Sequence, residues 1–555
     1  MIKKILFIFV LFSLFIVNTN AQELKDNFYV KVLSEELNRN IQKLHLEDLP
    51  KPFFIAYQFR NGSAMNIQGE RGDVTSTYKE PQTNKVVSVK LLVGDYHRNF
   101  EYMMYNQFVR LPDEDDADEI KRLLWLETDK AYKRVAQQYN STLTSLKRVT
   151  VDEKELALDD FSKITPIVKD FGLSAPFIVD ENKWKKIIGE LSTMFNQYPE
   201  ITSSNCQINF ANLEDYLITS EGTITRQPNS IVTFTAYASG RDTAGNNLTK
   251  SYSFNATKLS DMPSEEKLRE EIQSLIKEIQ EAANAKEIEN AYLGPVLFTN
   301  DAVPALIDNI FGRSMMVHRK SILGYGYGSD NYEDKLGQKL ISGELSLQAL
   351  PKLQSFKGVG ITGSFMIDDD GVIPPDSLIL IKNGILTTLL NGRTPTQKFP
   401  KSQGFAKSFT NKTYSPGVLM LKADKTIPAD SMKQKLIQTA KEEGLPFAYI
   451  VKDRNYINAD LYRVDINTGN EELVTACKIS NFNMRNLRRF VTASKEQALY
   501  NGSSISLITP QSILINEVEI EKRDQTSKPK PIIVTNPLLD KIAVANSSKK
   551  KRKRK

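Results

Sequence analysis

Two long segments repeat apolar residues at helical spacing. The clearer one runs from Pro263 to Ala285, where one apolar stripe lies among charged residues and consists of Leu268, Ile272, Leu275, Ile276 and Ile279. This stripe predicts an amphipathic helix that packs on the body of the protein, with a coiled-coil partner helix as the alternative. The second segment, Asp113 to Tyr139, gathers acidic residues at its start, which favours a helix through its dipole.

Other segments alternate apolar and polar residues, which is the pattern of half-buried strands. Lys51–Gly72 reads as two paired strands with Asn61-Gly62 as their turn, and Lys85–Tyr96 as a further strand. Asp376–Gly392 predicts a hairpin that turns at Asn383-Gly384.

The order of these elements predicts an α+β fold, because strands and helices are mixed without a regular βαβ rhythm. We expect a strand-and-helix N-terminal domain and a sheet-rich, mixed C-terminal domain. The chain then divides into a signal peptide, an N-terminal domain, a middle region that ends in the long amphipathic helix, a C-terminal domain and a basic tail, at 1–21, 22–148, 149–290, 291–533 and 534–555.

The chain begins with a short apolar run that predicts export. Lys3 and Lys4 precede the run Ile5–Val17, and Thr19-Asn20-Ala21 supplies small residues before a cleavage site at about Gln22. The run is too short to span a bilayer comfortably, and no later stretch reaches the roughly 18 apolar residues of a membrane helix. We therefore expect a periplasmic or secreted protein with no transmembrane span after cleavage.

Charge is concentrated in an appendage. The tail Lys549–Lys555 has seven positive charges, and removing it together with Lys3 and Lys4 changes the formal net charge from +6 to −3. A nearly neutral body in an exported protein argues against nucleic acid as a partner.

The 555 residues contain two cysteines, Cys206 and Cys477. An oxidising compartment permits a disulfide between them, and two free, buried thiols are the other possibility. The sequence leaves both open.

Candidate chemistry is sparse. Only His45, His97 and His318 are available for a catalytic triad or a zinc site. Gly358–Gly363 matches GxGxxG, but a strand-like run follows it instead of a helix, so we expect a turn. Asp368–Gly371 lacks the acidic spacing of a calcium loop, so we expect a solvated Asx turn.

Several segments together resemble the TldD/PmbA metallopeptidase family, in its exported branch. "GPVLFTNDAVPALIDNIFGR" is similar to a family strand and helix that carry H-E-x-x-G-H. Asp368–Pro395, "DDDGVIPPDSLILIKNGILTTLLNGRTP", resembles the family's D-D-E-G-V-P segment and the hairpin after it, and "KPFFIAYQF" and "WLETDKAYKRVAQQY" resemble its N-terminal part. The resemblance runs from about Lys51 to Ile533.

The chain departs from the family at the catalytic motif. The resemblance implies two histidines that bind zinc and a glutamate that activates water, whereas these positions hold Asp308, Asn309 and Arg313. Asn309 cannot serve as a general base and Arg313 has no lone pair for a metal. The loop "YNGSSISLITPQS" also lacks the cysteine that the resemblance implies there. Asp308 and His318 remain as weak metal candidates, so the sequence predicts no catalytic residue and no cofactor.

The resemblance implies a role as well as a fold. The family includes heterodimers in which only one subunit holds zinc, so we expect a non-catalytic partner of a homologous subunit with an intact motif, with a strand edge still open to a peptide. One alternative is a divergent peptidase that binds zinc around Asp308 and His318. A second alternative is an envelope binding protein that uses its basic tail.

Overall fold

The computed structural model describes residues 22–79, 85–100, 107–173, 175–242, 247–312, 314–317, 319, 323, 332–407, 415–453, 460–503 and 505–523. The expected signal peptide, the tail and the chain after residue 523 lie outside these ranges. Within them, no helix is both long and apolar enough to cross a membrane.

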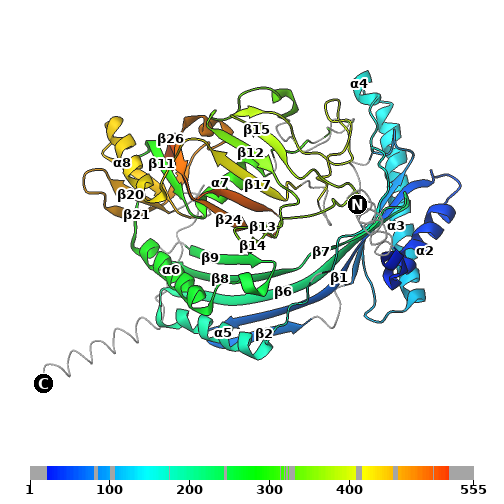
Figure 1. Cartoon of the computed structure of the whole chain (residues 1–555), viewed down its shortest axis with the longest axis horizontal. Coiled ribbons are helices and arrows are strands. Elements are labelled where there is room, and N and C mark those ends of the chain that lie inside the picture. Colours follow the sequence, from blue (N-terminus) through cyan, green and yellow to red (C-terminus); the bar gives the residue numbers. More distant parts are fainter. Residues whose placement is uncertain are drawn as a thin grey trace, which may run out of the picture.

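The first half of the chain forms one large curved sheet (Figure 1). Its strands follow the order β4-β3-β1-β6-β7-β5, with β2 on β1, β8 on β6 and β9 on β8. Their bounds are β1 Pro52–Glu70, β2 Asp73–Lys79, β3 Val86–Val93, β4 Gln107–Arg110, β5 Val168–Asp170, β6 Ile201–Thr219, β7 Ile224–Pro228, β8 Ile231–Arg241 and β9 Asn247–Ala256. The sheet therefore crosses the expected boundary at 148/149, because β1 of the N-terminal region pairs along its length with β6 of the middle region.

Helices cover two parts of one face of this sheet. One core lies under α2 (Phe28–Lys43) and α3 (Ala117–Leu146), and another under α5 (Glu181–Thr193) and α6 (Glu265–Asn284). The stripe expected for α6 is buried in the second core, so packing on the body is confirmed. The short helix α4 (Glu153–Leu156) follows α3.

The second half of the chain builds two further sheets around a common core. The second sheet contains β10 Lys286–Glu287, β11 Tyr292–Thr299, β18 Thr426–Ile427, β19 Phe447–Val451, β20 Leu461–Asp465, β21 Glu471–Thr475, β22 Cys477–Ile479, β23 Phe490–Ser494 and β26 Ser512–Lys522. The third sheet contains β12 Leu345–Ala349, β15 Leu378–Lys382, β16 Ile385–Leu386, β17 Val418–Ala423, β24 Gln497–Asn501 and β25 Ser506–Pro510. The helix α7 (Ala302–Phe311) lies in this core, and α8 (Met432–Glu442) packs on the second sheet. The α+β class is thus confirmed.

Local turn chemistry explains two expected turns. Asn383 and Gly384 have φ of 47° and 79° and join β15 to β16, as a two-residue hairpin requires. The GxGxxG segment is also a turn, because Lys357 and Gly358 join the short strands β13 (Ser355–Phe356) and β14 (Val359–Gly360).

The expected turn at Asn61-Gly62 is wrong. Residues 52 to 70 form the single strand β1, and Gly62 lies opposite Leu213 of β6. A Cβ at position 62 would lie 2.0 Å from the Asn212 carbonyl oxygen. Glycine is needed here for close approach of two strands, which local sequence does not distinguish from a turn.

Both cysteines are free and buried, in separate cores. Burial raises the pKa of Cys206 and of Cys477 to about 12, so both are thiols at neutral pH.

We expect Gly62→Ala to destabilise the protein by about 3 kcal/mol, because the new methyl group meets backbone atoms that cannot move independently. Urea unfolding followed by circular dichroism measures this change. Gly343→Ala is the control, since its nearest neighbour would be 3.7 Å away. Equal stability of the two variants would contradict the close approach.

Candidate functional site

The predicted motif helix is present and its apolar stripe is buried. β11 leads through Asn300, whose φ is 51°, into α7, which buries Val303, Leu306, Ile307 and other apolar residues. Asp308 is half-buried on the last turn, and Asn309 is exposed. Gly312 caps the C-terminus of α7, and its amide donates a helical hydrogen bond to the Asp308 carbonyl oxygen at 2.7 Å.

Zinc does not fit the residues that the structure describes around α7. Asp308 supplies one carboxylate, and Asn309 points to an exposed face of the helix. Nowhere in the described ranges do three His, Cys, Asp or Glu side chains gather as a metal would need. Arg313 and His318 lie outside the described residues, so their placement stays a prediction.

The Asp368–Gly371 turn is an Asx turn, but it is buried, so the expected solvated turn is wrong. The Asp368 carboxylate accepts hydrogen bonds from the amides of Asp370, Val372 and Ala406 at 3.1, 2.8 and 3.0 Å. Only 1% of Asp368 is exposed. Burial raises its pKa to about 8, and the neighbouring Asp370 carboxylate adds to this rise.

This turn docks on the first sheet through polar contacts. Lys90 of β3 binds the Asp370 carboxylate at 2.7 Å, and the Gln58 side chain donates to the Asp369 carbonyl oxygen at 2.9 Å. The Asp369 carboxylate binds Lys407 at 2.8 Å. The segment that resembles D-D-E-G-V-P thus joins the two halves of the chain.

A second contact between the halves is centred on Arg393, which is fully buried. Its guanidinium donates two hydrogen bonds of 2.7 Å to the Glu221 carboxylate and one of 2.8 Å to the Ser162 carbonyl oxygen. The same group lies 3.8 Å from the centre of the Phe161 ring. Tyr96 donates to Glu221 at 2.7 Å and completes the shell around this pair.

A third contact between the halves is made by Arg319. Arg319, 1% exposed, lies 3.0 Å from the Asp160 carboxylate, which also binds Arg98 at 2.9 Å. The other Asp160 oxygen accepts the amides of Asn99 and Phe100 at 2.9 and 2.8 Å. The first half of the chain therefore binds Arg319, which follows the motif helix in the sequence.

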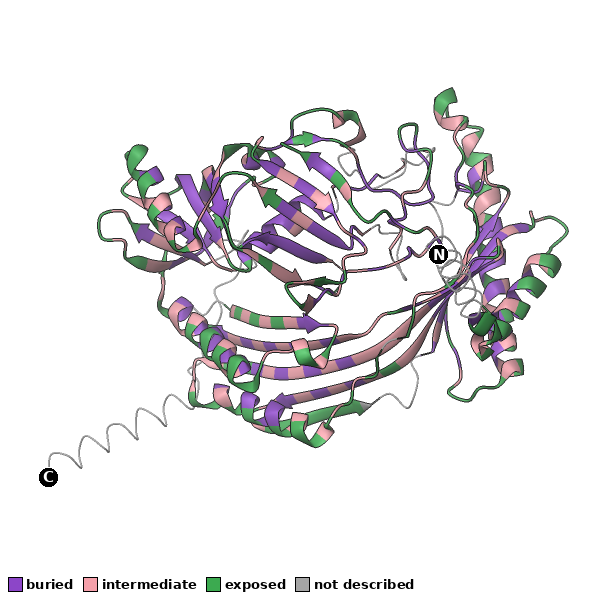
Figure 2. Cartoon of the chain, viewed as in Figure 1, coloured by how far each residue is buried: buried purple, intermediate pink, exposed green. Residues whose placement is uncertain are grey.

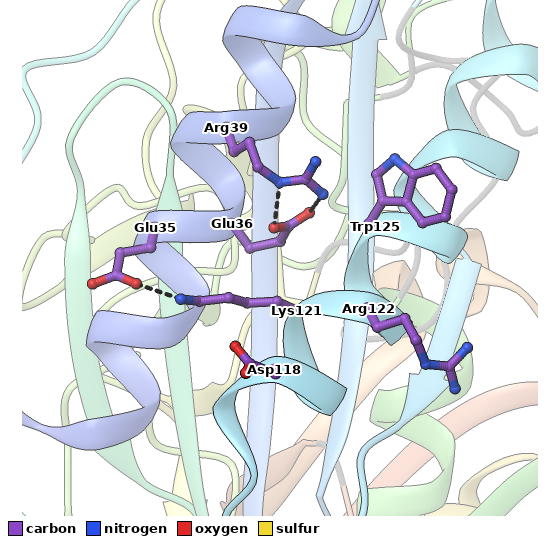
Figure 3. A pocket seen from close by; sticks show the side chains of 7 residues that line it. All are labelled: Glu35, Glu36, Arg39, Asp118, Lys121, Arg122 and Trp125. Carbon is purple, nitrogen blue, oxygen red and sulfur yellow. Dashed lines mark hydrogen bonds and ion pairs between the residues drawn. The ribbon is translucent and has the colours of Figure 1, made fainter.

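A surface hollow of about 490 Å³ lies between α2 and α3 (Figure 3). Its lining residues are Glu35, Glu36, Arg39, Asp118, Lys121, Arg122 and Trp125. Glu36 is paired with Arg39, and Lys121 binds Glu35 at 2.6 Å. Four of the six charged side chains in this wall are therefore paired with one another.

Sequence reasoning located Asp308 and Asn309 but missed the arginine contacts. Arg393 and Glu221 are separated by 172 residues, and no local periodicity marks either side chain. The sequence contained one indication that Arg393 matters, because the segment that ends in "NGRTP" resembles a family segment. This resemblance did not indicate which residue Arg393 binds.

Residues 291–453 match the family model of the PmbA/TldA metallopeptidase C-terminal domain. This part of the chain is thus similar to the C-terminal domain of the PmbA/TldD metallopeptidases. The matched range contains α7, the Asp368 turn and Arg393, so the family's segments carry the contacts described above. No curated protein matches the chain.

Solved structures share the fold along most of the chain. TldE from Thermococcus kodakarensis has a TM-score of 0.55 at 13% identity and covers 88% of this chain and 99% of its own. Two proteins described as candidate modulators of DNA gyrase are similar. The one from Bacteroides thetaiotaomicron has a TM-score of 0.57 at 12% identity (89% of this chain, 99% of its own), and the one from Thermotoga maritima has 0.55 at 13% (84% and 96%).

We expect Arg393→Ala to lower the free energy of unfolding by about 3 kcal/mol, because Glu221, whose side chain is 11% exposed, would keep its charge largely out of water without its partner. Urea unfolding measures the loss. Arg122→Ala is the matched control, since Arg122 pairs with Glu119 on an exposed helix surface and its removal should change stability little. A small loss of stability of similar size in both variants would show that the Arg393–Glu221 contact contributes little to stability.

The raised pKa of Asp368 predicts a pH dependence. Between the ordinary value of 3.8 and about 8 the folded state binds the proton that the unfolded state has lost, so this contribution to stability falls as pH rises through that window. The melting temperature of the wild type, relative to Asp368→Asn, should therefore fall from pH 6 to pH 9.

Asp376→Asn provides the control for that measurement, because the Asp376 side chain is 92% exposed. The wild type and this control should keep a constant difference across the same range. A constant difference for Asp368→Asn as well would show that Asp368 titrates normally.

Proposed function

We propose that this chain is an exported, non-catalytic partner subunit of a peptidase assembly and pairs with a homologous subunit that has an intact H-E-x-x-G-H motif. The observation that carries the proposal is an intact motif helix with altered chemistry. α7 keeps its buried stripe and its junction with β11, while Asp308 and Asn309 replace a zinc ligand and the base. The scaffold is preserved where the catalytic groups are changed.

The chemistry of the substituted residues supports this role. An amide such as that of Asn309 does not take up a proton near neutral pH. The fixed charge of Arg313 beside a dication would cost several kcal/mol even at an effective dielectric constant of about 20. The family resemblance implies pairing with a zinc-bearing homologue, and the fold shared with TldE from Thermococcus kodakarensis is consistent with such a subunit.

Export rests on the N-terminal pattern of Lys3, Lys4 and the apolar run before Ala21. A mature N-terminus near Gln22, read by mass spectrometry of the native protein, is the expected result. An intact Met1 would contradict export but would leave the proposed subunit role unaffected.

One second candidate has a specific observation in its favour. Asp308 is only half-buried, so it lies partly at the surface of α7, as a divergent zinc site with His318 would require. Two ligands are too few for tight zinc, since catalytic sites use about three protein ligands and a water.

We expect the purified mature chain to contain no stoichiometric zinc and to cleave no peptides alone. Elemental analysis and a peptidase assay measure both. The triple variant Asp308→His, Asn309→Glu, Arg313→His should remain inactive, because the late loop still lacks the third ligand.

Mixing the wild-type chain with a zinc-bearing homologue should yield a stable complex on size-exclusion chromatography.

Two results would contradict the proposed role. One equivalent of bound zinc, with chelator-sensitive peptidase activity that Asp308→Ala abolishes, would return this chain to the enzymes. Failure to form a complex with any homologue that has the intact motif would remove the partner role.

A further inference from the structure

The distal half of the first sheet has one face whose centre has no charged side chain. Along β1, β6, β8 and β9, buried residues alternate with more exposed ones, as the banding in Figure 2 shows. The buried ones pack against α5 and α6, so the others lie on the opposite face of the sheet. These outward positions are Ala64, Asn66, Gln68, Asn205, Gln207, Asn209, Ala211, Ile231, Thr233, Thr235, Tyr237, Ser239, Thr249, Ser251, Ser253 and Asn255. None of these is Asp, Glu, Lys or Arg, although 25% of the chain is charged. The charged residues at outward positions in this half of the four strands, Glu70 and Arg241, lie at the ends of β1 and β8. Solvated sheet faces normally carry such charges, so this composition needs a reason.

Five amide side chains lie together at the centre of this face, and we call them the amide face: Asn66, Gln68, Asn205, Gln207 and Asn209. Asn66 pairs with Asn209 and Gln68 with Gln207 across β1 and β6. Residues directly opposite one another have Cβ atoms about 4.5–5.5 Å apart, so the amides form an unbroken patch.

Hydroxyl groups and one aromatic ring extend the amide face along β8. Thr233 lies opposite Asn209, Thr235 opposite Gln207 and Tyr237 opposite Asn205. All three are partly exposed. The patch therefore continues across three neighbouring strands, which lie about 4.8 Å apart.

The amide face is not used by the protein itself. Within the described residues, none of its five side-chain amides makes a hydrogen bond, and all five are partly exposed. The proximal part of the same side differs, because Gln58 and Gln227 donate to carbonyl oxygens of the C-terminal half at 2.9 and 3.1 Å. Side-chain amides on this side of the sheet are hydrogen-bonded where the C-terminal half covers them. Among the described residues, the five of the amide face are not.

Amides that a protein leaves unsatisfied suit a ligand that both donates and accepts hydrogen bonds. Each amide offers one acceptor oxygen beside two N–H donors, which matches the neighbouring hydroxyls of a sugar ring. The ring of Tyr237 offers an apolar surface with a polar end, on which the C–H face of a sugar can pack. The amide face itself has no cation that would attract a polyanion and no charged side chain that would favour a charged peptide.

We propose that the amide face binds an uncharged oligosaccharide. The chain of sugars lies across β1, β6 and β8, on the side of the sheet that faces the C-terminal half. The site ends at Asn255. This residue is buried, and its side-chain amide already donates to the Asn501 carbonyl oxygen of β24 at 2.9 Å. This binding requires neither zinc nor a partner subunit.

The test uses the full mature chain and two neutral probes, the hexamers of β-1,4-linked glucose and of β-1,4-linked N-acetylglucosamine. Isothermal titration calorimetry should detect binding of at least one. The double variant Gln207→Ala, Asn209→Ala should weaken that binding at least tenfold with an unchanged melting temperature, since neither side chain has an internal partner. Asn182→Ala, at an exposed position of α5 outside the face, should bind as the wild type does.

Three outcomes would overturn the proposal. The first is no binding of either hexamer by the wild type. The second is binding that the double variant leaves unchanged. The third is that an extended peptide binds, loses affinity in the double variant, and no sugar binds, which would make the face a peptide surface.

Discussion

Arg393 is a fully buried arginine, and the junction between the two halves of this protein depends on its paired hydrogen bonds with Glu221. Among the described residues the apolar cores on either side are separate, and a small cluster around Phe54, Phe161 and Leu217 lies against Arg393. Once both charges are out of water, neither can be left alone without a large penalty. Two further ion pairs, Arg319–Asp160 and Lys90–Asp370, connect the two halves in the same way. Buried charge pairs tolerate little displacement, so they fix the relative position of the halves more strictly than apolar contact would.

Elements that depend on near neighbours in sequence could be predicted. The stripe of α6, the acidic start of α3 and the Asn383-Gly384 hairpin follow from spacing and turn chemistry that act over a few residues. Contacts between distant segments could not. Gly62 has the local signature of a turn, yet its role is decided by β6, and Asp368 has the signature of a surface turn, yet it is buried by the first sheet.

The same distinction applies to the candidate site. The positions of Asp308 and Asn309 on α7 follow from the sequence because a short helix after a strand is a local feature. The resemblance of "DDDGV" and "NGRTP" to family segments indicated which residues matter but not that they bind Lys90 and Glu221. The amide face also escaped notice, because its members come from strands that are far apart in sequence and are aligned only by pairing in the sheet.

The two buried thiols give this molecule a built-in pair of reporters. Cys206 lies in the core under α5 and α6, and Cys477 lies in the core around α7, so each sulfur becomes reactive only when its own core opens. The rates at which a thiol reagent modifies the two positions would separate opening of one half from opening of the whole. If the buried arginine contacts couple the halves tightly, the two sulfurs should react at one common rate, and a faster rate at one of them would identify the half that opens first.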